Sequence, residues 1–215
     1  HPEVFCENEI LYPDRLAKSN YYKRLKICWF PLCYIFPFLI KCEKKVFGIK
    51  ILDFHHPFVG NIVKNLYKKG WKIIHIQRRN VLKQALSGII AKKTNINITN
   101  KAGSLPTGVY HLSPERFMAE SKSRKKRFGQ EQEILSKIPH HEIVYEDHLQ
   151  IKDLWQNASN KIFDFLGIKS QPLVAKTEIT DTRPDWERIG NFDEIITFFM
   201  ANGHNEHVEN YYNNS

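Results

Sequence analysis

An arginine pair and a serine in the segment Trp71–Ser87 have the types and the spacing needed to hold a phosphate group. Arg78 and Arg79 directly follow an apolar run, and Ser87 stands eight positions after Arg79, which is about two helical turns. The planar guanidinium of arginine donates two parallel hydrogen bonds to phosphate oxygens. Arg79 and Ser87 would then hold one phosphate from two directions. Because this spacing also arises by chance, a solvated arginine and an ordinary helical serine are the alternative.

The segments around this pair alternate between strands and helices. Runs of β-branched and apolar residues predict strands at Glu3–Cys6, Val46–Leu52, Trp71–Gln77 and Ile143–Tyr145. Capping residues and apolar periodicity predict helices at Pro13–Lys26, from Pro57 to Gly70, from Asn80, at Ser113–Lys137, before Gly167 and from Asp193. This order predicts an α/β fold in which a parallel central sheet is flanked by helices. The polar end of the chain, Asn210–Ser215, is expected to fray.

Five segments together resemble the sulfotransferases that use 3′-phosphoadenosine 5′-phosphosulfate. Besides Trp71–Ser87, they are HPEVFCENE from His1, FGIKILDFH from Phe47, IVYEDHL and IFDFLGI from Ile143 and Ile162, and KTEITDTRPDWERIGNFDEI from Lys176. They occur in the family's order over nearly the whole chain. The resemblance implies a P-loop NTPase-like α/β architecture and a single sulfotransferase domain over residues 1–215.

The resemblance also assigns roles to individual residues. It implies that Arg79 and Ser87 bind the 3′-phosphate of the donor nucleotide and that Tyr145 lies by the adenine. Thr177 and Lys176 match the C-terminal segment that closes over the nucleotide. The donor is thus expected to be 3′-phosphoadenosine 5′-phosphosulfate, with no metal.

Three further residues match the positions where the family keeps its catalytic base and its charge-stabilising groups: Glu9, Lys50 and His55. Sulfuryl transfer, like phosphoryl transfer, needs positive charge around the moving group and a base within reach of the acceptor. His55 is attractive because the pKa of an unperturbed histidine lies near neutrality, although His55 also stands at a predicted helix start. Glu9 is an equal candidate for the base. Lys50 has the alternative of a strand-end lysine that extends into solvent.

One part of the family pattern is missing from the sequence. The loop that binds the 5′-phosphosulfate is a Ser/Thr- and Gly-rich turn, which the resemblance places before His1. The glycines at positions 60, 88, 103 and 108 are scattered and form no phosphate-binding motif. We therefore expect the domain to be truncated at its N-terminus.

Composition limits the partners and the compartment. The 215 residues carry a formal net charge of +9, which predicts anionic partners. Four cysteines, too few for a disulfide scaffold and without metal-ligand spacing, favour a reducing compartment, the cytoplasm. The apolar stretch Ile27–Ile40 is interrupted by prolines and is too short to span a bilayer, for which about 20 residues are needed. No transmembrane segment is expected, and the oligomeric state is open.

Other functions stay open at this point. A nucleic-acid-binding module would place aromatics among the basic residues of one face, whereas here the positive charge is spread along the chain. A nucleotide kinase would need a Walker loop and a magnesium carboxylate, for which Asp53 is the only fair candidate. A catalytically inactive nucleotide-binding relative is a further alternative. The acceptor is expected to be a small molecule or a glycan, carbohydrate or lipid-like, with a hydroxyl or an amine, and not a nucleic acid.

Overall fold

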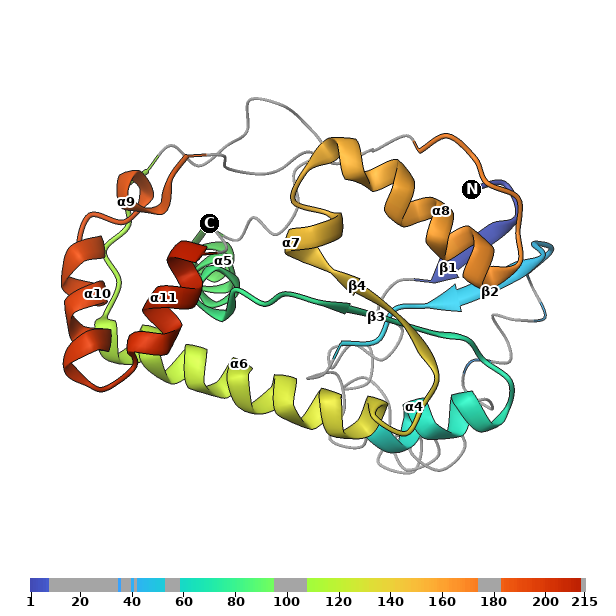
Figure 1. Cartoon of the computed structure of the whole chain (residues 1–215), viewed down its shortest axis with the longest axis horizontal. Helices are drawn as coiled ribbons and strands as arrows, with labels where there is room; N and C mark the ends of the chain where they lie inside the picture. The colour runs from blue at the N-terminus through green and yellow to red at the C-terminus, as the bar shows by residue number, and fades with distance from the viewer. Residues whose placement is uncertain are drawn as a thin grey trace. The chain divides into compact units, whose positions relative to one another are not determined.

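The computed structural model describes residues 1–7, 35, 40, 42–52, 59–94, 108–173 and 183–213 (Figure 1). Its contacts divide the chain into two compact units. The first comprises His1–His75, Gly129–Ile143 and Asn157–Gln171, and the second comprises Ile76–Phe128, Val144–Gln156 and Pro172–Ser215. That the chain forms one domain stays a prediction.

The first unit contains a two-stranded parallel sheet, as the sequence predicts for its first two strands. Strand β1 (Val4–Glu7) pairs with strand β2 (Val46–Ile49), so that Val4 lies opposite Val46. Phe5 and Phe47 are neighbours across the pair, with their rings stacked at 5.9 Å between centroids. Aromatic and β-branched residues favour this pleated, half-buried surface.

Two helices of the first unit end before glycines, one of which, Gly70, the sequence marks as a stop. Helix α4 (Val59–Lys68) buries Ile62 and Leu66 and ends before Gly70, whose φ is 84°. Most of helix α8 (Trp155–Leu166) also belongs to this unit, and it ends before Gly167 at φ 75°. Only glycine adopts this left-handed conformation without steric cost, so that the chain can turn away and the last carbonyls find donors.

A second two-stranded sheet joins strand β3 (Ile73–Gln77) to strand β4 (His140–Val144). The boundary between the units falls inside both strands, after His75 and after Ile143. Tyr145, which the sequence placed in a strand, instead begins the short helix α7 (Tyr145–His148). A 3₁₀ turn, η1 (Lys152–Leu154), follows it.

Helices make up the rest of the second unit. Helix α5 (Val81–Thr94) follows β3, and helix α6 (Pro114–Leu135) has its first two-thirds in this unit. Ser113 caps α6 as predicted, because its hydroxyl accepts the Arg116 N–H at 3.2 Å. Three helices complete the unit: α9 (Asp185–Arg188), α10 (Phe192–Ala201) and α11 (Asn205–Asn213).

The core of the second unit is formed by α5, α6, α10 and α11. Its buried residues include Leu82, Ala85, Leu86 and Ile89 of α5, Phe117 of α6, Ile195 and Phe199 of α10, and Val208 and Tyr211 of α11. The prediction of a frayed chain end is therefore wrong up to Asn213. Val208 and Tyr211 are three positions apart, so that both face the core from one side of α11.

These elements establish a general α/β class, while the P-loop-like sulfotransferase architecture stays a prediction. The strands that the structure describes lie in two separate two-stranded sheets, β1 with β2 and β3 with β4. Within the described residues they do not join into one larger central sheet. Within the described ranges, no helix has the length and apolarity to cross a membrane.

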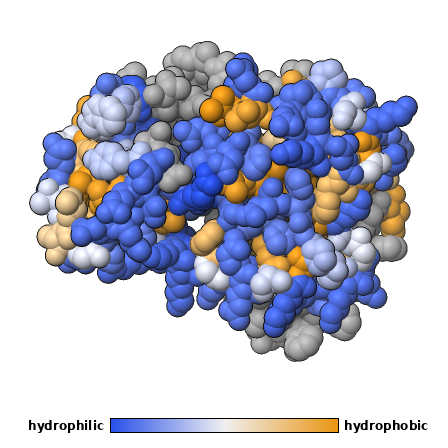
Figure 2. Space-filling model, viewed as in Figure 1, coloured by the Kyte–Doolittle hydropathy of each residue, from blue (hydrophilic) through white to orange (hydrophobic). Residues whose placement is uncertain are grey.

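The visible surface of the described residues is mostly hydrophilic (Figure 2). On the face shown in Figure 2, hydrophilic side chains predominate among the described residues, and hydrophobic ones form small separate patches. The basic run Ser123–Phe128 of α6 is partly neutralised within its own unit. Glu120 lies 3.0 Å from Arg124 and 3.9 Å from Arg127, and Lys125 pairs with Glu206 of α11. Lys125 and Lys126 of this run are exposed, while Arg124 and Arg127 are partly buried beside Glu120.

Candidate functional site

The predicted phosphate ligands lie in one unit, on two successive pieces of backbone. Arg79 lies two residues after the end of β3, and Ser87 lies in the second turn of α5. Both residues are exposed to solvent. Asn80 caps α5 as predicted, since its Oδ1 atom accepts the Lys83 N–H at 3.0 Å. The cap fixes where the helix begins and thereby the direction in which Ser87 points.

The start of α5 is also held by a carboxylate from α7. Glu146 is nearly buried, and its two oxygens accept the backbone N–H groups of Arg79 and Asn80 at 3.0 and 3.1 Å. A negative charge is favourable at the N-terminus of a helix. These two N–H groups are therefore occupied, so that a phosphate at this position would be held by side chains rather than by these amides.

The two consecutive arginines have different environments. The guanidinium of Arg78 lies over the ring of Tyr145, at 4.4 Å from the ring centroid, and its Nε is 3.7 Å from Glu146 Oε1. Burial lowers the pKa of Arg78, while Tyr145 and Glu146 act in the opposite direction. Arg79 instead faces solvent, with its side chain 46% exposed, and pairs with Asp147. Arg79 is the more accessible of the two to a ligand.

Tyr145 lies in the same unit as Arg79, next to the carboxylate that holds the Arg79 N–H. Its ring is half-buried, and Arg78 covers one of its faces. An adenine stacked on this ring would use the other face. The structure thus brings Arg79 and Tyr145 together around Glu146, with Ser87 on the adjoining helix.

The remaining predicted site residues do not join this group in the described structure. Lys50 directly follows β2 in the first unit and is exposed. The other four predicted residues, Glu9, His55, Lys176 and Thr177, lie outside the described residues. Their assignments as base and nucleotide contacts stay predictions.

Sequence reasoning missed the acidic partners of the site. Glu146 and Asp147 lie 67 and 68 positions after Arg79. In the sequence they stand out only as part of the segment IVYEDHL, which resembles a family motif. Lys83 was missed as well, although it precedes Ser87 by four positions on α5. That spacing places two polar side chains on one face of a helix, which is a signal that the sequence does contain.

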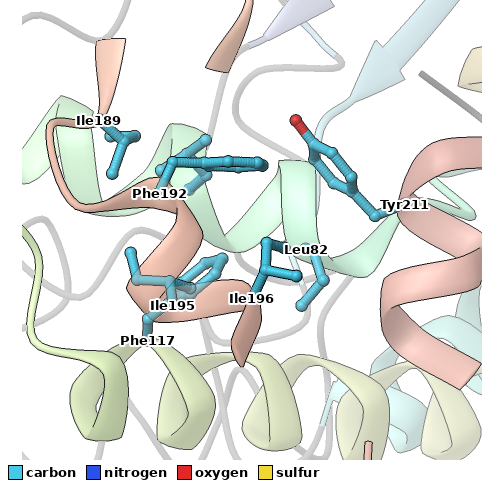
Figure 3. A pocket seen from close by; sticks show the side chains of 8 residues that line it. Leu82, Phe117, Ile189, Phe192, Ile195, Ile196 and Tyr211 are labelled. Atoms are coloured by element: carbon cyan, nitrogen blue, oxygen red, sulfur yellow. The ribbon is translucent and has the colours of Figure 1, made fainter. Parts of the chain in front are cut away.

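A small pocket in the second unit has the wrong chemistry for a nucleotide. Its lining is entirely apolar except for one tyrosine: Leu82, Leu86, Phe117, Ile189, Phe192, Ile195, Ile196 and Tyr211 (Figure 3). The hydroxyl of Tyr211 points away from Leu82 and Ile196. The volume of about 10 Å³ is about that of one water molecule. This pocket belongs to the core.

No metal site is apparent among the described side chains. Within these ranges, no three His, Cys, Asp or Glu side chains gather closely enough to hold an ion. Cys42 is a free thiol.

No family model matches the chain, and neither a curated protein nor a solved structure matches it. The function is therefore argued from the residues themselves and from their geometry.

Proposed function

We propose that this protein binds 3′-phosphoadenosine 5′-phosphosulfate through Arg79 and Ser87 and acts as a sulfotransferase. The observation that carries the proposal is that Arg79 and Ser87, two exposed side chains of types that can bind a phosphate, lie at the start of one helix. Arg79 precedes α5 and Ser87 lies in its second turn, within one compact unit. The ordered resemblance to sulfotransferase segments supports the same assignment.

The ion pair with Asp147 is weak enough to leave Arg79 available to a phosphate. Both side chains are almost half exposed, and exposed pairs contribute only about 0–1 kcal/mol. A doubly charged phosphate competes well against such a partner, because a bidentate arginine–phosphate contact is charge-assisted. Until a phosphate binds, Asp147 limits the conformations of the Arg79 side chain.

The reaction that we propose is an in-line transfer. A hydroxyl or amine of the acceptor, a carbohydrate or a lipid-like molecule, forms a bond to sulfur while the bond from sulfur to the bridging phosphate oxygen breaks. The nucleotide leaves as 3′-phosphoadenosine 5′-phosphate with the electron pair of that bond. A base, for which His55 and Glu9 are the candidates, takes the acceptor proton, and Lys50 is the candidate for stabilising charge on the transferred group.

The test is a calorimetric comparison of two nucleotides. 3′-Phosphoadenosine 5′-phosphate carries the 3′-phosphate, and adenosine 5′-monophosphate does not. We expect the first to bind at least tenfold more tightly. Arg79→Ala should remove most of that difference, and Ser87→Ala should remove a smaller part of it. Asp147→Asn should tighten binding, because it removes a competitor and a like charge.

Matched controls separate the site from the general charge of the protein. Arg116→Ala and Ser123→Ala remove the same groups from exposed positions of α6 and should leave both affinities unchanged. Equal binding of the two nucleotides, or an equal loss in Arg79→Ala and Arg116→Ala, would refute the 3′-phosphate site. Binding that depends on Arg79 without turnover of a panel of acceptors would indicate an inactive relative.

A further inference from the structure

Three cations of the second unit, Arg78, Lys83 and Arg188, lie near two carboxylates whose oxygens already have partners. Asp185 is 8% exposed at its side chain and lies 3.2 Å from Arg188 through Oδ1, and its Oδ2 accepts the Tyr211 hydroxyl at 2.6 Å. The other carboxylate, Glu146, gives both oxygens to backbone N–H groups. All four carboxylate oxygens thus already have a partner among the described residues.

Each of the two arginines has one buried donor without an acceptor among the described residues. The Nε atoms of Arg78 and Arg188 are buried, and neither has a hydrogen-bond partner among the described residues. Arg78 reaches Glu146 only at 3.7 Å, which is beyond hydrogen-bonding distance. A buried donor without an acceptor costs free energy. A ligand that supplies an acceptor to these two Nε atoms would therefore be stabilised.

Lys83 adds a third positive charge to the same group. It projects from the first turn of α5, and its Nζ lies 5.7 Å from the centroid of the Tyr211 ring, whose hydroxyl holds Asp185. The pKa of Lys83 is lowered, and burial is the largest cause. Asp185 then raises this pKa, and Arg78 and Arg188 lower it. The three cations therefore act on one another, and they exceed the two carboxylates by one charge.

We propose that Arg78, Lys83 and Arg188 form a binding site for a tetrahedral oxyanion, a phosphate or a sulfate group. Such an anion brings up to four acceptor oxygens and the negative charge that the cluster lacks. Its source is either a free inorganic anion or the phosphoryl group of a larger ligand. The inference concerns residues other than Arg79 and Ser87, and it does not depend on the sulfotransferase proposal.

The test uses inorganic sulfate and inorganic phosphate at millimolar concentration, each against chloride at equal ionic strength, with the thermal unfolding midpoint as the measurement. A ligand at about ten times its Kd should raise the midpoint of the wild type by about 3–6 °C. Lys83→Met should lose most of this shift, and Lys83→Arg should keep it. Lys92→Met, on the exposed side of the same helix, is the matched control and should respond as the wild type does.

A second measurement distinguishes binding from a structural role of Lys83. Without sulfate or phosphate, Lys83→Met should unfold at a midpoint no lower than that of the wild type, because a half-buried charge that other cations repel has been removed. A purely structural lysine would instead lower that midpoint. If sulfate shifts the wild type and Lys83→Met equally, the effect is a general one of the salt and the proposal is overturned.

Two further comparisons identify the site and the source of the anion. Arg79→Ala should keep the sulfate shift. If Arg79→Ala loses the shift and Lys83→Met keeps it, the anion binds at Arg79 and Ser87 instead, and the proposal is overturned. Saturation with 3′-phosphoadenosine 5′-phosphate should abolish the sulfate shift if the site takes a phosphoryl group of the nucleotide. It should leave the shift intact if the site takes a free anion. If the nucleotide does not bind but sulfate still gives a shift that depends on Lys83, the proposed function is wrong and the oxyanion site stands.

Discussion

The two sides of α5 carry different kinds of side chain, and we assign them different roles. One side buries aliphatic residues in the core of the second unit, among them Leu86 at 3% exposure. The other side carries Lys83 and Ser87, and Arg79 precedes it. The apolar side stabilises the unit through burial, whereas the polar side contributes little burial and carries the proposed ligands. This difference indicates that stability and binding can be changed separately by substitutions in one helix.

Two neighbouring residues give the largest expected contrast. Leu86→Ala should lower the free energy of unfolding by about 2–5 kcal/mol, because it leaves a cavity in the core. At a temperature where this variant is folded, its nucleotide affinity should equal that of the wild type. Ser87→Ala should change stability by less than about 0.5 kcal/mol and weaken nucleotide binding. Urea unfolding and calorimetry measure the two quantities, and a loss of both in either variant would break the comparison.

The next contrast lies within α7. Glu146→Gln should cost roughly 2–3 kcal/mol, because a buried carboxylate that accepts two N–H groups is replaced by an amide with only one acceptor oxygen. Asp147→Asn, at the exposed neighbouring position, should cost less than about 1 kcal/mol. Urea unfolding at neutral pH compares the two variants. Equal costs would mean that burial does not distinguish these carboxylates.

Local signals explain what the sequence predicted correctly. The helix starts at Asn80 and Ser113 and the helix stop at Gly70 depend on residues within four positions of one another, and the structure has all three. Arg79 and Ser87 were found by the same kind of reasoning, since a strand end and a helix spacing are both local features.

Features that depend on contacts between distant segments were missed. Tyr145 has the β propensity of an aromatic residue, but the carboxylate that follows it holds the start of α5, and the chain turns into α7 there. The polar chain end was expected to fray, yet Tyr211 is buried and bonded to Asp185, 26 positions earlier. Composition reports the polarity of such a segment, while its partners are determined only by the tertiary fold.

Tyr211 provides a contrast of intermediate size that depends on pH. Tyr211→Phe should cost about 1–2 kcal/mol at pH 7, because Asp185 loses a donor in a buried place. Tyr212→Phe, at the exposed neighbour, should cost less than about 0.5 kcal/mol. Urea unfolding of both variants measures these costs.

The sign of the pH effect follows from the pKa of Tyr211. Burial raises this pKa, and the hydrogen bond to Asp185 raises it further, so that the folded chain keeps the phenol neutral where an unfolded tyrosine ionises, from about pH 10. The stabilisation is therefore complete below about pH 10 and is lost as the pH rises above it. The advantage of the wild type over Tyr211→Phe should shrink by about 1.4 kcal/mol per pH unit there. A constant advantage from pH 9 to pH 11 would contradict this assignment.

The smallest contrast concerns the cap from which both sides of α5 begin. Asn80→Ala should lower stability by about 1 kcal/mol, because the Lys83 N–H loses its acceptor. Asn80→Ser keeps a capping oxygen but not the amide that donates to the Tyr211 carbonyl at 3.1 Å, so that its cost should be smaller if capping is the main role. Urea unfolding ranks the two variants. A serine variant as unstable as the alanine variant would show instead that the contact between α5 and α11 is what Asn80 supplies.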